Sequence, residues 1–206
     1  MSEQLQIELV RLIPAIAWVV FGLLALCLFY KSIRESILPR LSSFKAFGVE
    51  ASFVKETLDK ASEHVPAGDE KSKSAVARRA ERINSIVAGA KILLVNDHPE
   101  EMSSVIEILN SMKMTVTVAT NTDAALRLLK ANLYDVVLSD MVRDEGENEG
   151  LVFLNKAVEK GIHRPTILTV GRYEPERGTP AYAFAITNRV DELLHYVFDV
   201  LERSRS

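Results

Sequence analysis

The sequence "YDVVLSDMVR", residues 134–143, combines the pattern of a buried strand with a carboxylate at its end. A mostly apolar run, with the β-branched pair Val136 and Val137 at its centre, leads directly to the carboxylate of Asp140. Such a run, bounded by polar residues, is typical of a strand buried on both faces of a parallel sheet. Asp140 therefore stands where this strand ends. It is either a reactive carboxylate at the mouth of the sheet or a polar residue at the start of a loop.

The segments on both sides of this stretch alternate between strand and helix patterns. The strand-like runs are "KILLV", "TVTVAT", "YDVVLS", "TILTV" and part of "AYAFAIT". Apolar residues at helical spacing occupy 102–109, 125–129, 151–160 and 193–201. Strands that alternate with helices imply a parallel sheet covered on both faces. We predict an α/β fold over residues 90–206, a flavodoxin-like doubly wound sheet of five parallel strands in the order 2-1-3-4-5.

Two carboxylates follow neighbouring strands of this sheet. In such folds, ligands bind at the carboxyl ends of strands beside the switch in strand order. Asp97 ends the first strand and Asp140 ends the third, so the order 2-1-3-4-5 places them side by side. Two adjacent carboxylates repel each other unless a cation joins them, and their oxygens suit Mg²⁺. The sequence predicts a magnesium site that contains a candidate nucleophile.

These residues resemble the receiver domain of two-component response regulators. The resemblance runs from Lys91 to Arg203 and rests on "ILLVNDHPE", "YDVVLSDM" and the alternation of strands and helices. Two further stretches, "SDMVRDEGENEG" and "TNRVDEL", are similar to stretches of a divergent bacterial receiver-like group. The resemblance implies the receiver fold and a role in signalling.

The resemblance also implies a role for each matching residue. Asp140 corresponds to the aspartate that accepts a phosphoryl group from a histidine kinase, and Asp97 corresponds to the direct Mg²⁺ ligand. The backbone carbonyl of Val142 completes the metal ligands of the protein, and Asn96 contributes indirectly. Because the metal and backbone amides neutralise the phosphoryl oxygens, the attacking carboxylate needs no separate base. The added charge would then act as a switch.

Three positions depart from the pattern of the family. Asn96 stands where most receivers have a second acidic residue, and Asn188 replaces a lysine that contacts the phosphoryl group. Val170 occupies the place of a switching serine or threonine, although a shift of one residue puts Thr169 there. Asn188 can alternatively be the N-cap of the last helix. The segment 171–187 is short for a helix plus a strand, so we expect the fourth helix of the fold to be reduced.

An apolar segment without charge, Leu12 to Tyr30, precedes the domain. At about 1.5 Å per residue its roughly 19 residues span about 28 Å, enough to cross a bilayer core. We predict a transmembrane helix within residues 1–31; a cleaved signal peptide and a lipoprotein site at Cys27 are the alternatives. Basic residues are more frequent after the segment: Lys31, Arg34, Arg40 and Lys45. This bias predicts a single-pass protein of the bacterial inner membrane with a cytoplasmic C-terminal domain.

Residues 32–89 are predicted to form a helical linker between that segment and the domain. Two short apolar seams have helical spacing: Val54, Leu58, Ala61 and Val65, then Val76, Ala80, Ile83 and Val87. The seams indicate either amphipathic helices that lie on the domain or on a membrane surface, or a parallel coiled-coil stalk in a homodimer. Pro66 to Ser74 is the best candidate for a linker.

The resemblance, together with the apolar N-terminal segment, implies a membrane-anchored response-regulator receiver that accepts a phosphoryl group on Asp140 in a phosphorelay and is not an enzyme. Its partners would be a histidine kinase or phosphotransfer protein and an unknown downstream protein. The net charge of −3 gives no case for nucleic acid. One alternative is a phosphorylation-independent adaptor or scaffold at the membrane, favoured by Asn96 and Asn188. Another, an aspartate-based phosphatase, is disfavoured because Val142 replaces its second aspartate.

Overall fold

A five-stranded parallel sheet is the centre of the computed structural model, which describes residues 18, 51–62, 66–174, 176 and 178–205. The strands are β1 (Lys91–Val95), β2 (Thr115–Ala119), β3 (Val136–Asp140), β4 (Thr166–Thr169) and β5 (Ala185–Thr187). They pair in the order β2-β1-β3-β4-β5, and every pairing is parallel. The predicted flavodoxin-like fold and its strand order are confirmed.

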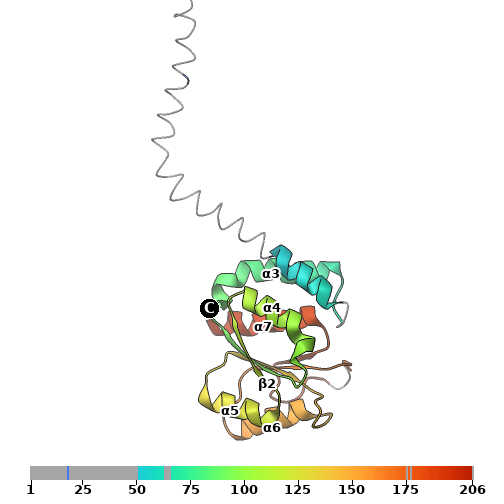
Figure 1. Cartoon of the computed structure of the whole chain (residues 1–206), viewed down its shortest axis with the longest axis vertical. Helices are drawn as coiled ribbons and strands as arrows, with labels where there is room; N and C mark the ends of the chain where they lie inside the picture. Colours follow the sequence, from blue (N-terminus) through green and yellow to red (C-terminus); the bar gives the residue numbers. More distant parts are fainter. Residues whose placement is uncertain (1–17, 19–50, 63–65, 175, 177, 206) are drawn as a thin grey trace, which may run out of the picture. The chain divides into compact units, whose positions relative to one another are not determined.

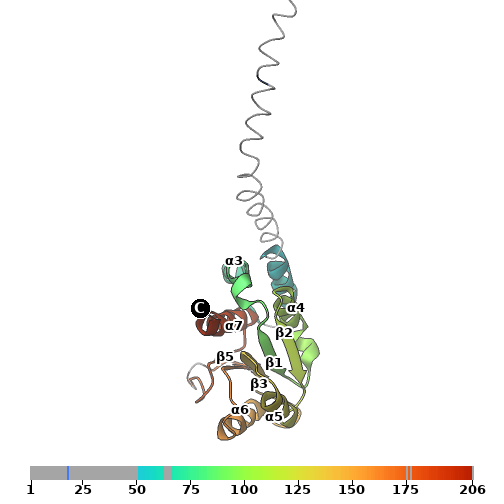
Figure 2. The same cartoon turned by 90° about the vertical axis from the view of Figure 1, so that its left-hand side faces the viewer.

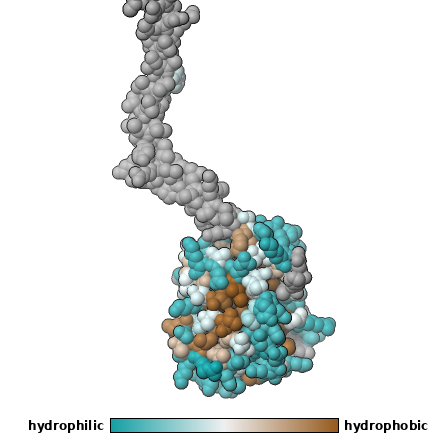
Figure 3. Space-filling view, in the orientation of Figure 1, coloured by the Kyte–Doolittle hydropathy of each residue, from teal (hydrophilic) through white to brown (hydrophobic). Residues whose placement is uncertain are grey.

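The inner strands are buried along nearly their whole length. β1 is buried from Ile92 to Val95, and β3 has four buried residues before the half-buried Asp140. Strands with a neighbour on each side and helices on both faces have no solvent-facing side, so their residues are apolar throughout. The edge strand β2 differs, because Val118 is exposed, and Figure 3 shows apolar surface in the region of this strand.

Helices cover both faces of the sheet (Figures 1 and 2). One face carries α5 (Thr122–Ala131) and α6 (Glu149–Glu159). The other carries α4 (Ser103–Ser111), which follows the short 3-10 helix η2 (Pro99–Met102), and α7 (Val190–Arg205). In the described residues between β4 and β5 there is no α-helix, so the structure agrees with a reduced fourth helix of the fold.

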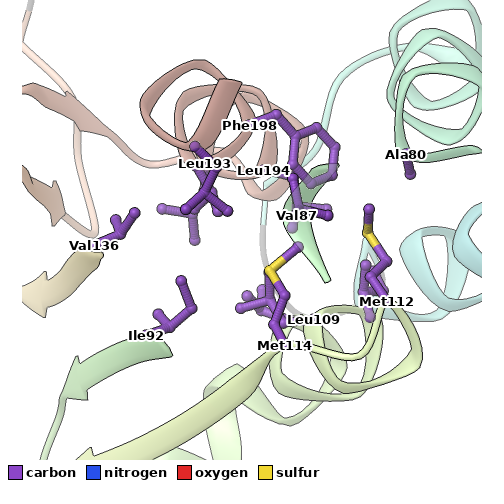
Figure 4. Packing of buried hydrophobic residues seen from close by; sticks show 14 of the residues in the cluster. Ala80, Val87, Ile92, Leu109, Met112, Met114, Val136, Leu193, Leu194 and Phe198 are labelled. Atoms are coloured by element: carbon purple, nitrogen blue, oxygen red, sulfur yellow. The ribbon is translucent and has the colours of Figure 1, made fainter. Parts of the chain in front are cut away.

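Successive residues of the inner strands pack into two different cores. Ile92 and Val136 pack with residues of α4 and α7 (Figure 4), whereas Leu93 and Val137 pack with residues of α5 and α6. This alternation follows from the period of two along a strand. Apolar side chains therefore cover both faces of the sheet, and polar groups reach the inner strands at the two ends of these strands.

A further helical layer covers α4 and α7. It consists of α3 (Glu70–Val87) and the helical residues 51–61, which belong with the sheet to one compact unit, Gly48–Ser206 (Figure 1). The buried seams of both helices join the core of α7: Val54, Leu58, Val76, Ala80, Ile83 and Val87. The two helices thus lie on the domain, one of the arrangements that their spacing predicts. Val65 lies outside the described residues.

The connection before α3 is shorter than its composition predicts. Asp69 is the N-cap of α3, because its side chain accepts a hydrogen bond from the amide of Ser72 at 2.8 Å. The helix therefore begins at Glu70 and includes Ser74, the predicted end of the linker. A domain boundary at residue 90 remains a prediction.

The predicted membrane localisation is wrong on the present finding. In the part of the chain that the structure describes, no helix is both long and apolar enough to cross a bilayer. α3 has 18 residues, but it carries charged side chains such as Lys73 and Arg79, which are costly to place in hydrocarbon. The predicted span, Leu12–Tyr30, and the basic residues after it lie outside the described residues, apart from Trp18.

Candidate functional site

The carboxyl ends of β1 and β3 lie at the same edge of the sheet. Val95 of β1 pairs with Ser139 of β3, so the chain reaches Asp97 just beyond one strand and Asp140 at the end of the other. Parallel neighbours with this register bring residues far apart in sequence to one place. The structure therefore brings together the two carboxylates that the sequence analysis singles out.

Asp140 is half-buried and held by two hydrogen bonds. Its Oδ1 accepts from the amide of Met141 at 3.0 Å and from the hydroxyl of Thr169 at 3.1 Å. Burial raises the pKa of Asp140, and the charge of Asp97 adds to this effect. The two hydrogen bonds and the charge of Arg143 oppose it only in part, so the pKa lies above its ordinary value. The surroundings of Asp140 thus destabilise its ionised form relative to its protonated form.

Thr169 reaches Asp140 because the two residues pair across β3 and β4. Val170, which follows the end of β4, is half-buried. Of the two positions considered for a switching hydroxyl, the one shifted by a residue is the one that contacts Asp140. A switching role for Thr169 remains a prediction.

Asn96 fixes the turn after β1. Its side-chain Oδ1 accepts a hydrogen bond from the amide of His98 at 2.7 Å, and its own amide donates to the carbonyl of Ala119 at 3.0 Å. This is the local bond by which asparagine stabilises turns, and Asn96 is only 4% exposed. The turn holds Asp97 at the edge of the sheet, while an indirect role of Asn96 in metal binding remains a prediction.

Asp97 contacts the loop that follows β3. Its Oδ2 accepts a hydrogen bond from the amide of Asp144 at 2.6 Å. Partial burial raises the pKa of Asp97, but hydrogen bonds from the amides of Asp144 and of Asp97 itself lower it, together with the charges of His98 and Arg143. The net pKa lies below its ordinary value. Asp97 is therefore ionised at neutral pH, the form in which a carboxyl group binds a hard cation.

His98 and Asp144 extend the polar edge toward solvent. The Nε2 atom of His98 lies 3.6 Å from Oδ1 of Asp144, and its Nδ1 lies 3.3 Å from Oε1 of Glu100. Asp97, His98 and Asp144 each offer a possible ligand atom within 4.8 Å of the others. These groups are largely exposed, and such acidic surfaces commonly hold no ion. We therefore assign them no site of their own.

The backbone at Asp140 is enclosed by α6. A Cβ atom on Gly150 would lie 2.9 Å from the carbonyl oxygen of Asp140 and 2.9 Å from Cα of Met141, closer than such atoms approach. The amide of Gly150 also donates to the carbonyl of Met141 at 3.1 Å. Only glycine permits this approach. α6 thereby fixes the peptide units that carry Asp140 and, beyond it, the exposed Val142.

Arg143 is a site residue that the sequence analysis missed. Its side chain has an exposed fraction of 0%. Nη1 donates to Oγ of Ser139 at 3.1 Å and to the carbonyl of Asp140 at 2.8 Å, and Nη2 donates to Oγ1 of Thr122 at 2.8 Å. Charged residues are almost never fully buried. The sequence around Arg143, a polar and acidic loop, predicts exposure and contains no signal of this burial.

Asn188 lies after β5, beside the chain that precedes α3. It lines an open hollow of about 530 Å³ with Pro66, Ala67, Gly68, Asp69 and Arg189. The carbonyl of Arg189 accepts the first helical hydrogen bond of α7, from the amide of Leu193 at 3.0 Å. Asn188 is therefore not the N-cap of this helix. The position of the expected lysine is occupied by a neutral side chain at the rim of the hollow.

Residues 92–183 match the family model described as the response regulator receiver domain. The chain is similar in structure to the receiver domain of the Francisella response regulator 1452, with 21% identity and a TM-score of 0.51, over 56% of this chain and 99% of that one. It is also similar to a two-component response regulator from Clostridium difficile, with 16% identity and a TM-score of 0.50, over 57% of this chain and 99% of that one. No curated protein matches the chain.

The class of this part of the chain follows from these findings. The structural likenesses confirm the fold, and the family match assigns residues 92–183 to the response regulator receiver domain. Receiver domains are signalling modules of two-component systems and are generally not enzymes. The resemblance on which the sequence analysis relied is confirmed for these residues.

Proposed function

We propose that this receiver accepts a phosphoryl group on Asp140 in a phosphorelay. The observation that carries the proposal is the position of Asp140, half-buried at the carboxyl end of β3, with its Oδ1 held by Met141 and Thr169. The edge also holds the ionised carboxylate of Asp97. The family match of residues 92–183 supports the same function. The phosphoryl donor would be a histidine kinase or a phosphotransfer protein, and an unidentified protein would receive the signal.

The donor set at this edge fits Mg²⁺. Asp97, Asp140 and the backbone carbonyl of Val142 are hard oxygen ligands, the kind that Mg²⁺ prefers. Burial raises the pKa of Asp140 and the nearby Asp97 raises it further, so a cation there would relieve the cost of two neighbouring negative charges. When bound, Mg²⁺ would neutralise part of the charge on the phosphoryl oxygens.

The transfer itself needs little from the protein beyond placement. A carboxylate oxygen of Asp140 attacks the phosphorus in line, and a new P–O bond forms as the bond from phosphorus to the donor breaks. The leaving group departs with the electron pair of that bond, and because the attacking form of Asp140 is the carboxylate, this step releases no proton. The hydroxyl of Thr169, which now donates to Oδ1 of Asp140, is placed to donate to an oxygen of the new phosphoryl group.

Phosphorylation by a small donor tests the proposal. The purified chain is incubated with acetyl phosphate and Mg²⁺, and its intact mass is measured over time. We expect the gain of one phosphoryl group in the wild type and none in Asp140→Asn. Asp123→Asn, which removes an exposed carboxylate at the start of α5, is the matched control and should behave as the wild type does. A wild type that gains no mass would favour the adaptor that works without phosphorylation.

A further inference from the structure

Arg143 brings a full positive charge into the interior beside Asp140. Its guanidinium contacts three elements: the end of β3 through the carbonyl of Asp140, the start of α5 through Thr122, and the start of α6 near Glu149. A buried charge is costly unless close partners satisfy it. The effect of Arg143 on neighbouring groups therefore depends on how completely these partners neutralise its charge.

The partners of Arg143 are mostly neutral. The hydroxyls of Ser139 and Thr122 and one backbone carbonyl accept its hydrogen bonds. Its ion-pair partner Glu149 lies 3.8 Å away, between Nη2 and Oε2, and that oxygen already accepts a hydrogen bond from Thr122 at 3.2 Å. The buried Nε has no hydrogen-bond partner among the described residues. Much of the positive charge is thus left to act on neighbouring groups through a medium of low dielectric constant.

The groups on which this charge acts are the two carboxylates at the edge. Burial is the largest single effect on the pKa of each carboxyl group and raises it, whereas hydrogen bonds and the charge of Arg143 lower it, so the net pKa lies above the ordinary value for Asp140 and below it for Asp97. The side chain thus favours negative charge where the phosphoryl group would be attached.

The cation next to Asn188 in the sequence is already engaged. Arg189 follows Asn188, but its Nε and Nη2 donate to Asp191 at 3.2 and 2.6 Å. Its Nη1 lies 3.1 Å from Oε1 of Glu192. Two carboxylates therefore neutralise Arg189, and Asn188 itself is uncharged.

We infer that Arg143 is a positioning residue for phosphoryl transfer: it supplies from inside the domain the positive charge that Asn188 cannot supply. The inference rests on the proposed function of Asp140. A phosphoryl group adds about two negative charges at neutral pH. A fixed cation that is already in place stabilises such charge as it develops, without reorganisation. Through the carbonyl of Asp140, the same guanidinium also fixes the backbone of the attacking residue.

Two substitutions separate the charge of Arg143 from its hydrogen bonds. Arg143→Gln keeps a hydrogen-bond donor and removes the charge. Arg143→Lys keeps the charge and loses the planar guanidinium group with its fixed set of hydrogen-bond donors. With acetyl phosphate and Mg²⁺, we expect the initial rate of phosphorylation to fall about tenfold or more in Arg143→Gln. It should stay within about threefold of wild type in Arg143→Lys. Arg79→Gln removes a mostly buried arginine of α3 from its bonds to α7, and is the control for lost stability alone.

Each outcome decides between the roles. A rate in Arg143→Gln equal to that of wild type overturns the inference but leaves the proposed function intact. The rate of phosphorylation could instead fall equally in both variants while thermal unfolding shows that both are folded. This result overturns the role of the charge and leaves Arg143 with a structural role only. A wild type that takes no phosphoryl group removes the proposed function and the inference together.

A variant that leaves Arg143 in place covers the case in which Arg143→Gln does not fold. Glu149→Gln keeps an acceptor for Thr122 but removes the charge that partly neutralises Arg143. If the free charge of Arg143 assists transfer, Glu149→Gln should take up phosphoryl faster than wild type, by about twofold to fivefold. An unchanged or lower rate overturns the inference, because a purely structural role predicts no gain.

Discussion

The backbone amide of Gly68 donates a hydrogen bond to Oδ1 of Asp191 at 2.8 Å, across 123 positions of the sequence. Asp191 is 0% exposed, and it also accepts hydrogen bonds from the hydroxyl of Ser72 and from Arg189. Burial raises the pKa of Asp191, but these bonds lower it more, so the net pKa lies below its ordinary value. We call these four residues the Asp191 clasp. It joins the start of α3 to the start of α7.

The Asp191 clasp lies close to the carboxyl edge of the sheet. The amide of Val190 donates to the carbonyl of Pro66 at 3.1 Å, so the chain before α3 runs beside the residues that follow β5. Asn188 lines the same hollow as Gly68. The helical layer of α3 is therefore attached next to Asn188, the position that the resemblance equates with the phosphoryl-contacting lysine of receivers.

Gly68→Ala should open the Asp191 clasp. A Cβ atom at this position would overlap Nη2 of Arg189 and lie 2.6 Å from Oδ2 of Asp191, so both groups must move. We expect the free energy of unfolding, measured by urea denaturation, to fall by about 1–3 kcal/mol, the cost of buried polar groups that lose a partner. The control is Gly171→Ala, whose Cβ would meet no described atom within 4 Å. Equal stability of the two variants would show that the clasp contributes nothing.

The Asp191 clasp also predicts a pH dependence of stability. Because the pKa of Asp191 is lower in the folded state, its contribution is fully present above the ordinary value of 3.8 and is lost as the pH falls through the folded pKa. Asp191→Asn lacks this contribution at every pH. The difference in unfolding free energy between wild type and variant should therefore be constant near neutral pH and shrink in acid. A difference that grows as the pH falls would contradict this assignment.

Asp140→Asn should stabilise the protein in the absence of Mg²⁺. Burial raises the pKa of Asp140 in the folded state. The free energy of unfolding therefore falls as the pH rises from 3.8 to the folded pKa, and this loss of stability persists at higher pH. The variant removes this loss. We expect a gain of about 1 kcal/mol at pH 7 in a thermal melt with a chelator, allowing for the partial exposure of the carboxyl group. Glu159→Gln, at an exposed position of α6, is the control for a change in net charge, and an equal gain there would refute the explanation.

The sheet was predictable because its inner strands are apolar runs, and the adjacency of Asp97 and Asp140 follows from strand order alone. Other features depend on tertiary contacts that no local pattern encodes. The helical spacing of its apolar residues indicates which face of α3 is apolar. It does not indicate that α7 covers this face. The sequence alone could not decide between Thr169 and Val170, because successive residues of a strand point to opposite faces of the sheet.

Buried polar residues were the hardest to predict. Arg143 and Asp191 both occur in charged stretches, "MVRDEGE" and "NRVDEL", that are typical of solvated loops and helix starts. Both become buried only because distant segments supply their partners, Thr122 for Arg143 and Gly68 with Ser72 for Asp191. Such pairings have no period and no local signature in a single sequence.

Mg²⁺ should bind through Asp97 and Asp140 together. We expect each single variant, Asp97→Asn and Asp140→Asn, to weaken the affinity by about tenfold or more, because a neutral amide is a poorer ligand for this cation than a carboxylate. Isothermal titration of the purified chain with Mg²⁺ measures the affinity directly. Asp123→Asn serves again as the matched control on an exposed carboxylate. Unchanged affinity in either site variant would mean that the pair is not a metal site.

The packing of α3 on α7 predicts how the domain behaves without its additional helices. Arg79 of α3 lies over the ring of Phe198 at 5.7 Å and bonds Asp199 at 2.6 Å. A fragment of residues 88–206 keeps the sheet and its four helices, so we expect it to unfold cooperatively in urea, as a boundary at residue 90 requires. It should be less stable than a fragment of residues 48–206 by about 2–5 kcal/mol, because the apolar face of α7 becomes exposed. Loss of cooperative unfolding in the shorter fragment would move the boundary to include α3. Equal stability of both fragments would show that the buried seam of α3 contributes nothing to the fold.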